Sequence, residues 1–131
     1  MNDILFERRG AAGIVTLNRP TARNAVPHAL VLRLREPLDA WSDDDAVTRV
    51  VIPAAGERAF SAGGDIRRLY DLGKAGCYEE ALQFWRDEYP LNVAIKTYRK
   101  PYVALIDGLA MGGGVGVSVH GSHRVAGDRF S

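Results

Sequence analysis

Cysteine is almost absent from this sequence of 131 residues, since Cys77 is the only one. One thiol cannot form an internal disulfide, and without CxxC spacings we expect no metal site. An excess of one charge is missing too, because 17 basic residues face 16 acidic residues and leave a net charge of +1. This balance gives no electrostatic reason to expect nucleic acid or an anionic membrane surface as a partner.

Long hydrophobic runs are also missing. The longest nearly uncharged stretch, residues 101–121, is interrupted by Asp107 and rich in glycine. Its apolar part is shorter than the roughly 20 residues that a membrane-spanning helix needs. The first ten residues, MNDILFERRG, contain acidic side chains and no apolar run, which argues against a secretory signal and an arginine-rich transit peptide. Together with the lone cysteine, this predicts a cytoplasmic protein.

Strand patterns and helix patterns alternate along the chain. Strands are expected at 4–9, 13–18, 48–54, 102–106 and 123–126, and helices at 27–41, from 65, at 78–98 and at 113–120. We expect Pro37 to kink the first helix and Pro90 to break or bend the third. The alternation predicts an α/β fold in which helices flank both faces of a mostly parallel sheet.

Two glycine-rich loops each join an expected strand to an expected helix. Residues 59–66 read AFSAGGDI and residues 108–116 read GLAMGGGVG. Adjacent glycines at a helix start leave unpaired N–H groups that can face an anionic ligand. Taken alone, each loop could equally be a tight turn. A phosphate-binding P-loop is excluded because no Gly-Lys-Ser/Thr follows, and no GxGxxG fits the glycine triplet.

Five motifs in order resemble the crotonase (enoyl-CoA hydratase/isomerase) superfamily. They are LNRP at 17–20, RNAV at 23–26, AFSAGGDI at 59–66, KPYVALIDG at 100–108 and MGGGVG at 111–116. The resemblance implies a truncated crotonase-like ββα spiral, in which residues 1–131 form the N-terminal part of a single domain and the C-terminal part is missing. Members of this superfamily often form trimers through C-terminal helices that are absent here, so we expect any homo-oligomer to be weaker or altered.

The resemblance also implies a site. The backbone N–H groups of Gly64 and Gly113 would form an oxyanion hole for a thioester carbonyl. Coenzyme A would enter as part of an acyl-CoA substrate, with no separate cofactor. The contacts implied for coenzyme A are Arg23, Ala62, Asp65 and Ile66. From cap preferences alone, Asp65 is simply the N-cap of the helix that follows it.

Gly116 limits the choice among the acyl-CoA reactions of this family, because hydratases of the family have a glutamate at this position. Residues 84–131 look more like the 3-hydroxyisobutyryl-CoA hydrolase branch, whose activity belongs to valine catabolism and whose catalytic carboxylates would lie beyond Ser131. We therefore expect hydrolysis of a short-chain acyl-CoA thioester. An enoyl-CoA hydratase or isomerase and a non-catalytic CoA-binding fragment, inactive alone, are the alternatives.

The sequence indicates no second catalytic centre made of side chains that are close together along the chain. Ser118 and His120 lie two residues apart on an expected helix, so they face different sides and cannot form a dyad. An apolar stripe in the helix of residues 78–98 follows the helical period and is therefore interpreted as core. Its members are Leu82, Trp85, Tyr89 and Val93.

Overall fold

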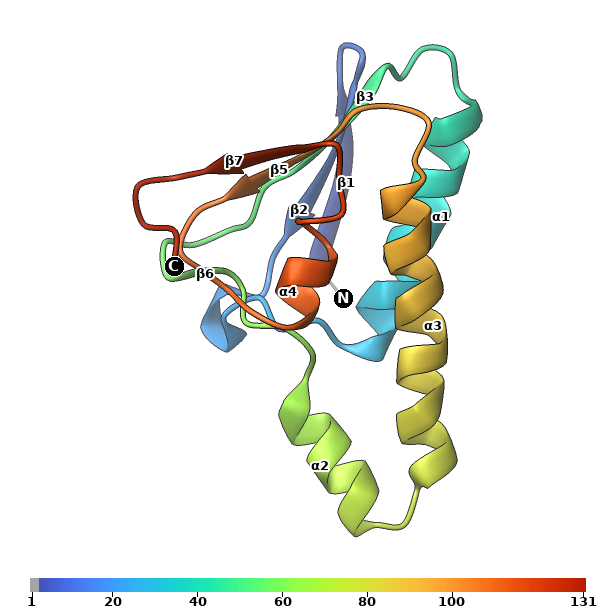
Figure 1. Ribbon diagram of the computed structural model, residues 1–131, viewed down its shortest axis with the longest axis vertical. Helices are drawn as coiled ribbons and strands as arrows, with labels where there is room; N and C mark the ends of the chain where they lie inside the picture. Colours follow the sequence, from blue (N-terminus) through green and yellow to red (C-terminus); the bar gives the residue numbers. More distant parts are fainter. Residues whose placement is uncertain (1–2) are drawn as a thin grey trace.

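A five-stranded sheet is the centre of the fold in the computed structural model, which describes residues 3–131 (Figure 1). The strand order is β1-β2-β3-β5-β7. Strand β1 is antiparallel to β2, and all other neighbours are parallel, which confirms the predicted α/β class. The strands are β1 (Ile4–Arg9), β2 (Ala12–Leu17), β3 (Arg49–Ile52), β5 (Tyr102–Ile106) and β7 (His123–Ala126).

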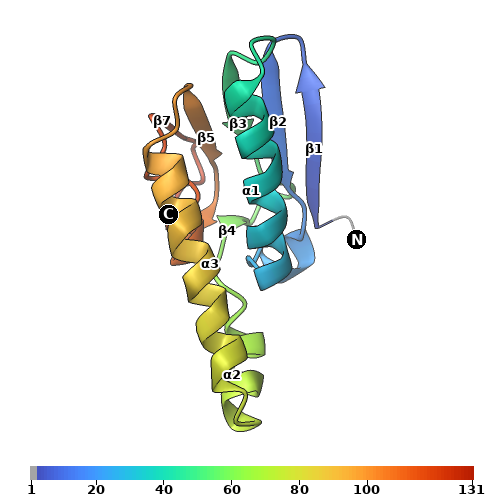
Figure 2. The same ribbon diagram turned by 90° about the vertical axis from the view of Figure 1, so that its right-hand side faces the viewer.

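Two long helices, α1 (His28–Asp43) and α3 (Tyr78–Lys96), lie side by side over one face of this sheet (Figure 2). The buried face of α1 consists of Leu30, Val31, Leu34 and Leu38. Both helices continue through their prolines, Pro37 and Pro90, so the predicted break at Pro90 does not occur. Packing of the flanking turns offsets the loss of one backbone hydrogen bond at each proline.

The opposite face of the sheet differs from the prediction that helices would flank both faces. Along β5 the side chains of Tyr102, Ala104 and Ile106 are buried under the helices, whereas Leu105 is 40% exposed. On β7, Val125 is 51% exposed. Alternate residues of a strand point to opposite faces, so this apolar surface belongs to the face away from α1 and α3.

A second, small sheet positions the two glycine loops. Strands β4 (Ala59–Ser61) and β6 (Leu109–Ala110) pair in parallel, so their carboxyl ends lie together. Each leads into a loop and then a helix: β4 into α2 (Ile66–Lys74), and β6 into the single turn α4 (Gly113–Gly116). A 3-10 turn, η1 (Pro20–Ala22), precedes α1. The sequence patterns missed this two-stranded sheet, and α4 is shorter than the expected 113–120.

Gly114 lets α4 pack against β4. A β-carbon at this position would lie 2.3 Å from the Ser61 carbonyl oxygen and 2.8 Å from the Ser61 side chain. Ser61 is fully buried in the small sheet, so it has little room to move. The glycine is therefore required for the close approach of the second loop to the first.

We predict that Gly114→Ala lowers the free energy of unfolding by about 1–3 kcal/mol, the usual cost of overpacking a close contact. Gly73→Ala is the matched control, because a β-carbon there would meet nothing within 4 Å and Gly73 lies inside α2. That variant should be neutral or gain up to about 1 kcal/mol from helix propensity. Urea denaturation of both variants measures the difference, and equal stabilities would contradict the packing account.

Candidate functional site

The first glycine loop is fixed by hydrogen bonds to the segment that precedes α1. The Asn24 side chain donates to the Ala59 carbonyl oxygen at 2.9 Å, and the Ser61 hydroxyl donates to the Asn24 carbonyl oxygen at 2.8 Å. The Val26 N–H donates to the Gly63 carbonyl oxygen at 2.7 Å. Gly63 has φ of +102°, a conformation that glycine adopts without strain. These contacts leave the next peptide, at Gly64, in a defined orientation.

The two glycine loops meet directly. A β-carbon built on Gly63 would lie 2.8 Å from the Met111 carbonyl oxygen and 3.1 Å from the Gly113 nitrogen. One built on Gly113 would lie 3.3 Å from the Gly64 nitrogen. Within residues 3–131, neither the Gly64 N–H nor the Gly113 N–H donates a hydrogen bond. The structure thus brings together the two glycines that the sequence singled out, each with an unused backbone donor.

A cleft of about 380 Å³ opens where the loops meet. It is bounded by Gly64, by the α4 turn and by one face of α3. The α3 residues that line it fall at helical spacing, so they share that face. They are Phe84, Trp85, Glu88, Tyr89 and Asn92.

Glu88 is a site residue that the sequence analysis missed. It is 8% exposed, and a β-carbon on Gly113 would lie 2.9 Å from its Oε1 atom. Burial raises the pKa of this carboxyl above its ordinary value, because desolvation disfavours the charged form. A usable signal was an acidic residue at helical spacing from Phe84, within the FWRDEYPLN segment. A largely buried carboxyl with a raised pKa therefore borders Gly113, one of the two backbone donors.

Asn92 lies one helical turn after Glu88 and faces Gly116. A β-carbon on Gly116 would lie 2.9 Å from Asn92 Oδ1 and 3.2 Å from Asn92 Nδ2. Oδ1 is the buried side-chain atom without a hydrogen-bond partner among residues 3–131. The amide therefore occupies the space into which a side chain at position 116 would extend.

Contacts from α1 and the first loop hold the inner face of α3 in place. Phe84 packs against Gly64, where a β-carbon would lie 3.5 Å from its ring. His28 Nε2 and Asp87 Oδ2 are 2.6 Å apart, which links the start of α1 to α3. Hydrogen bonds from His28 and then Gln83 hold the pKa of Asp87 below its ordinary value. This link ties the start of α1 to the middle of α3.

The residues expected to contact coenzyme A lie on the first loop and its support. Ala62 N–H donates to the Arg23 carbonyl oxygen at 2.9 Å, so these two are neighbours, and the Arg23 side chain is exposed. Asp65 caps α2, because its Oδ1 accepts from the Arg68 N–H at 3.2 Å. Ile66 is exposed beside the cleft. The four positions are contiguous in space, and their contact with coenzyme A stays a prediction.

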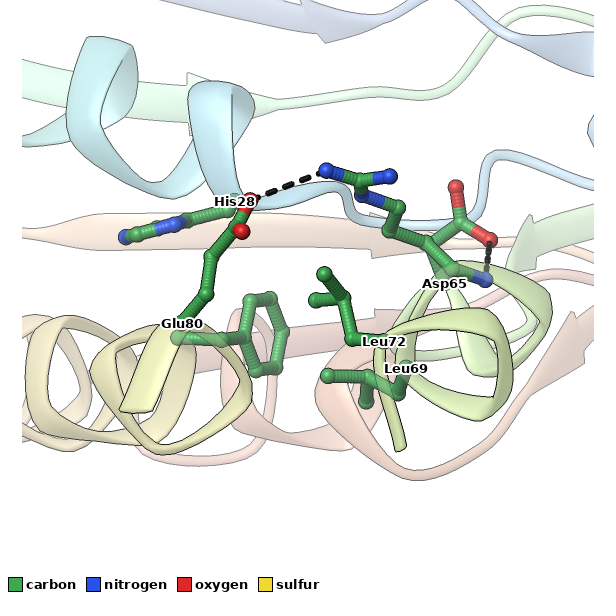
Figure 3. Close-up of a pocket in the computed structure, with 7 residues that line it drawn as sticks. His28, Asp65, Leu69, Leu72 and Glu80 are labelled. Carbon is green, nitrogen blue, oxygen red and sulfur yellow. Dashed lines mark hydrogen bonds and ion pairs between the residues drawn. The ribbon is translucent and has the colours of Figure 1, made fainter. Parts of the chain in front are cut away.

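A second pocket lies behind the first loop, between α2 and α3 (Figure 3). It is lined by His28, Asp65, Leu69, Leu72 and Glu80, together with Arg68 and Phe84. Arg68 and Glu80 close it with an ion pair of 2.9 Å. Its volume of about 40 Å³ is far smaller than the 380 Å³ of the cleft between the glycine loops. The site that can accept a ligand is the larger cleft.

The interpretation of the stripe on α3 as core is wrong. Trp85 is 36% exposed and Tyr89 is 61% exposed, and both line the cleft. The core side of α3 consists instead of Phe84, Leu91 and Ile95, which lie on the face toward α1 and the sheet. The helical period is the same for both faces, so periodicity could not distinguish them.

The described part of the chain contains no second catalytic group at Ser118, no metal site and no membrane-spanning helix. The Ser118 hydroxyl is buried and donates to the Gly114 carbonyl oxygen at 2.7 Å, which is a structural contact. Among residues 3–131 no group of three His, Cys, Asp or Glu side chains could hold a metal ion. No helix in that range is both long and apolar enough to span a membrane.

Comparison with known proteins identifies relatives of nearly the whole chain. The profile of the family described as Enoyl-CoA hydratase/isomerase matches residues 12–131. The mitochondrial 3-hydroxyisobutyryl-CoA hydrolase of Danio rerio is 51% identical over 125 residues, which are 95% of this chain and 32% of that protein. The Homo sapiens protein of the same name is 45% identical over 124 residues, again 95% and 32%. The chain thus spans about a third of these relatives.

Solved structures share the fold closely. An enoyl-CoA hydratase from Rhodobacter sphaeroides superimposes with a TM-score of 0.95 at 43% identity, covering 98% of this chain and 38% of that one. A carnitinyl-CoA dehydratase from Mycobacterium thermoresistibile gives a TM-score of 0.95 at 47% identity, covering 99% and 38%. The crotonase-like fold expected from the sequence motifs is thereby confirmed.

The predicted cytoplasmic location is contradicted by these comparisons. The similar vertebrate proteins are named as mitochondrial. The prediction rested on a lone cysteine and on the composition of ten residues. A reducing compartment and a balanced charge do not distinguish the cytoplasm from the mitochondrial interior.

We predict that Glu88→Gln stabilises the protein at neutral pH and that the gain shrinks as the pH falls. The raised pKa of Glu88 means that its ionised form is penalised in the folded state. That penalty is full above the folded pKa and vanishes only below the lower pKa of the unfolded chain, whereas glutamine carries no charge at any pH. Thermal unfolding across pH 4–8, roughly the range around a raised glutamate pKa, measures the effect.

The exposed Glu36 provides the control for this experiment, as Glu36→Gln should shift the melting temperature little at any of these pH values. A Glu88→Gln variant that is less stable than the parent at neutral pH would show that the charge is compensated, and the buried-carboxyl account would fail.

Proposed function

We propose a function that follows from the family to which this chain belongs, the enoyl-CoA hydratase/isomerase (crotonase) family. The cleft binds the acyl end of a coenzyme A thioester, and the protein hydrolyses this thioester. The observation on which this proposal depends is the pair of unpartnered N–H groups, at Gly64 and Gly113, that border one cleft. They would donate to the thioester carbonyl oxygen as an oxyanion hole.

The chemistry of thioester hydrolysis requires such donors. When water attacks the carbonyl carbon, negative charge develops on the carbonyl oxygen before the thiolate leaves. Backbone donors that are already in position stabilise this charge more than they stabilise the ground-state carbonyl, which lowers the barrier. Because both loops are fixed by packing and hydrogen bonds, the donors need no reorganisation during the reaction.

The charge state of Glu88 is also relevant to the proposed oxyanion hole. An ionised carboxylate beside Gly113 would repel a developing oxyanion, whereas a protonated carboxyl would not. Burial raises the pKa of Glu88, which favours the protonated form next to the proposed hole. We infer that Glu88, which lines the cleft beside Gly113, contacts the acyl group.

Hydrolysis is favoured over hydration by Gly116, which has no acid–base group and faces the Asn92 amide. The vertebrate relatives named 3-hydroxyisobutyryl-CoA hydrolase favour the same reaction, with 3-hydroxyisobutyryl-CoA as substrate. Enoyl-CoA hydration is the second candidate, because the similar solved structures are named as a hydratase and a dehydratase. Both reactions would use the same two backbone donors.

The coenzyme A part of the substrate is proposed to lie along the first loop. Ala62, Asp65 and Ile66 would contact the adenine through their backbone, and Arg23, with its exposed side chain, would face the phosphates. This is supported by the hydrogen bond from the Ala62 N–H to the Arg23 carbonyl oxygen and by Ile66, a neighbour of Asp65 in sequence, which lines the cleft.

The intact gene product should hydrolyse 3-hydroxyisobutyryl-CoA and should not hydrate crotonyl-CoA. Release of free thiol from the first substrate and loss of the enoyl absorbance from the second give the two rates. Hydration of crotonyl-CoA without thioester hydrolysis would replace the first candidate with the second. Binding of coenzyme A thioesters without either reaction would point to the non-catalytic alternative.

Gly64→Pro should lower kcat/KM by about 10²–10³, because proline lacks the N–H that the oxyanion hole needs. Gly64→Ala is the matched variant: it keeps the N–H, and its β-carbon would only touch the Phe84 ring at 3.5 Å. Alanine should therefore cost far less activity than proline. If both variants lose activity equally while their melting temperatures match the parent, the Gly64 N–H is not the donor.

A further inference from the structure

Asn92 is the least satisfied polar side chain of the cleft. Its Oδ1 atom is buried without a partner, and its Nδ2 atom also makes no hydrogen bond within residues 3–131. A buried polar group without a partner destabilises a folded protein, so this arrangement has an energetic cost in the free state. Asn92 lines the same cleft as Gly64, Gly113 and Glu88, so its amide lies within the candidate site.

Gly116 and Asn92 form a complementary pair. Any side chain at position 116 would begin 2.9 Å from Asn92 Oδ1, which is too close for an unbonded contact. With a side chain at position 116 the Asn92 amide would have to shift, so glycine at this position leaves room for the amide where it lies. In place of an acid–base group from α4, this cleft has a neutral amide from α3 that can both donate and accept hydrogen bonds.

We propose that the Asn92 amide binds a hydroxyl group on the acyl portion of the thioester and so selects hydroxylated acyl groups over plain alkyl ones. This proposal rests on the function proposed above and specifies the substrate class for the same cleft. Asn92 acts here as a specificity-determining residue, distinct from the two backbone donors that hold the carbonyl oxygen.

The position of Asn92 on α3 fits this role. Glu88 and Asn92 are four residues apart, so their side chains are neighbours on one helix face. Glu88 borders Gly113, the proposed carbonyl donor, and Asn92 borders Gly116 at the next turn of the loop. A hydroxyl a few bonds from the carbonyl carbon would therefore meet the amide when the carbonyl lies against Gly113. Half a turn about the terminal side-chain bond exchanges Oδ1 and Nδ2, so either end can face the hydroxyl.

The selectivity of binding tests this inference without requiring turnover. The probes are two ketone analogues of acyl-CoA in which a methylene replaces the thioester sulfur, one with a 3-hydroxyisobutyryl group and one with an isobutyryl group. They differ only in the hydroxyl. Isothermal titration with the intact gene product should give a dissociation constant about tenfold lower for the hydroxylated analogue, as expected for a hydrogen bond in a desolvated site.

Three variants separate the amide from its surroundings. Asn92→Ala and Asn92→Leu should both reduce the preference to about twofold or less, and leucine does so while keeping the volume of the side chain filled. Gln83→Ala removes an exposed amide from the same helix outside the cleft and should keep the full preference. The affinity for the isobutyryl analogue should change little in any variant. A general loss of structure would instead weaken the binding of both analogues.

Two results would overturn the proposal: equal affinity of the parent protein for the two analogues, or an Asn92→Leu variant that retains the tenfold preference. Failure of the proposed hydrolysis is a separate outcome. It would appear as preferential binding of the hydroxylated analogue together with no thiol release from 3-hydroxyisobutyryl-CoA, and it would leave the role of Asn92 in binding supported.

Discussion

Parallel pairing of β4 with β6 is the constraint on which the site depends. It places the ends of two short strands side by side, so that the glycine loops that follow them begin at neighbouring points. Gly63 and Gly114 then allow the loops to touch without a side chain between them. The result is two backbone nitrogens, at Gly64 and Gly113, whose N–H groups have no partner in the described chain and whose residues line one cleft. No side chain could supply donors that are as rigidly fixed.

Helix α3 determines what surrounds these donors. Its buried face packs on the core through Phe84, Leu91 and Ile95 and also carries Glu88, which borders the cleft together with Asn92. One element thus links core stability to site chemistry, because a shift of α3 would move both polar groups. The Asn92 amide occupies the space into which a side chain at position 116 would extend.

The sequence predicted the fold class, the main strands and the two loops, because alternating patterns and clustered glycines are local signals. It failed where the outcome depended on packing between distant segments. The pairing of β4 with β6 leaves no local pattern, since these strands have three and two residues. Glu88 and Asn92 were missed because each is an ordinary polar residue of a helix until α3 is placed against the second loop. Trp85 and Tyr89 were assigned to the core because periodicity alone cannot tell a core face from a cleft face.

The central claim is that the Gly64 and Gly113 N–H groups polarise one carbonyl. Isotope-edited infrared spectroscopy of a ketone analogue of acyl-CoA, labelled with carbon-13 at its carbonyl, measures this polarisation directly. Two strong donors weaken the carbonyl bond, so the account predicts a lower stretching frequency for the bound analogue than for the same analogue in water. A bound carbonyl that vibrates at or above its frequency in water would contradict it.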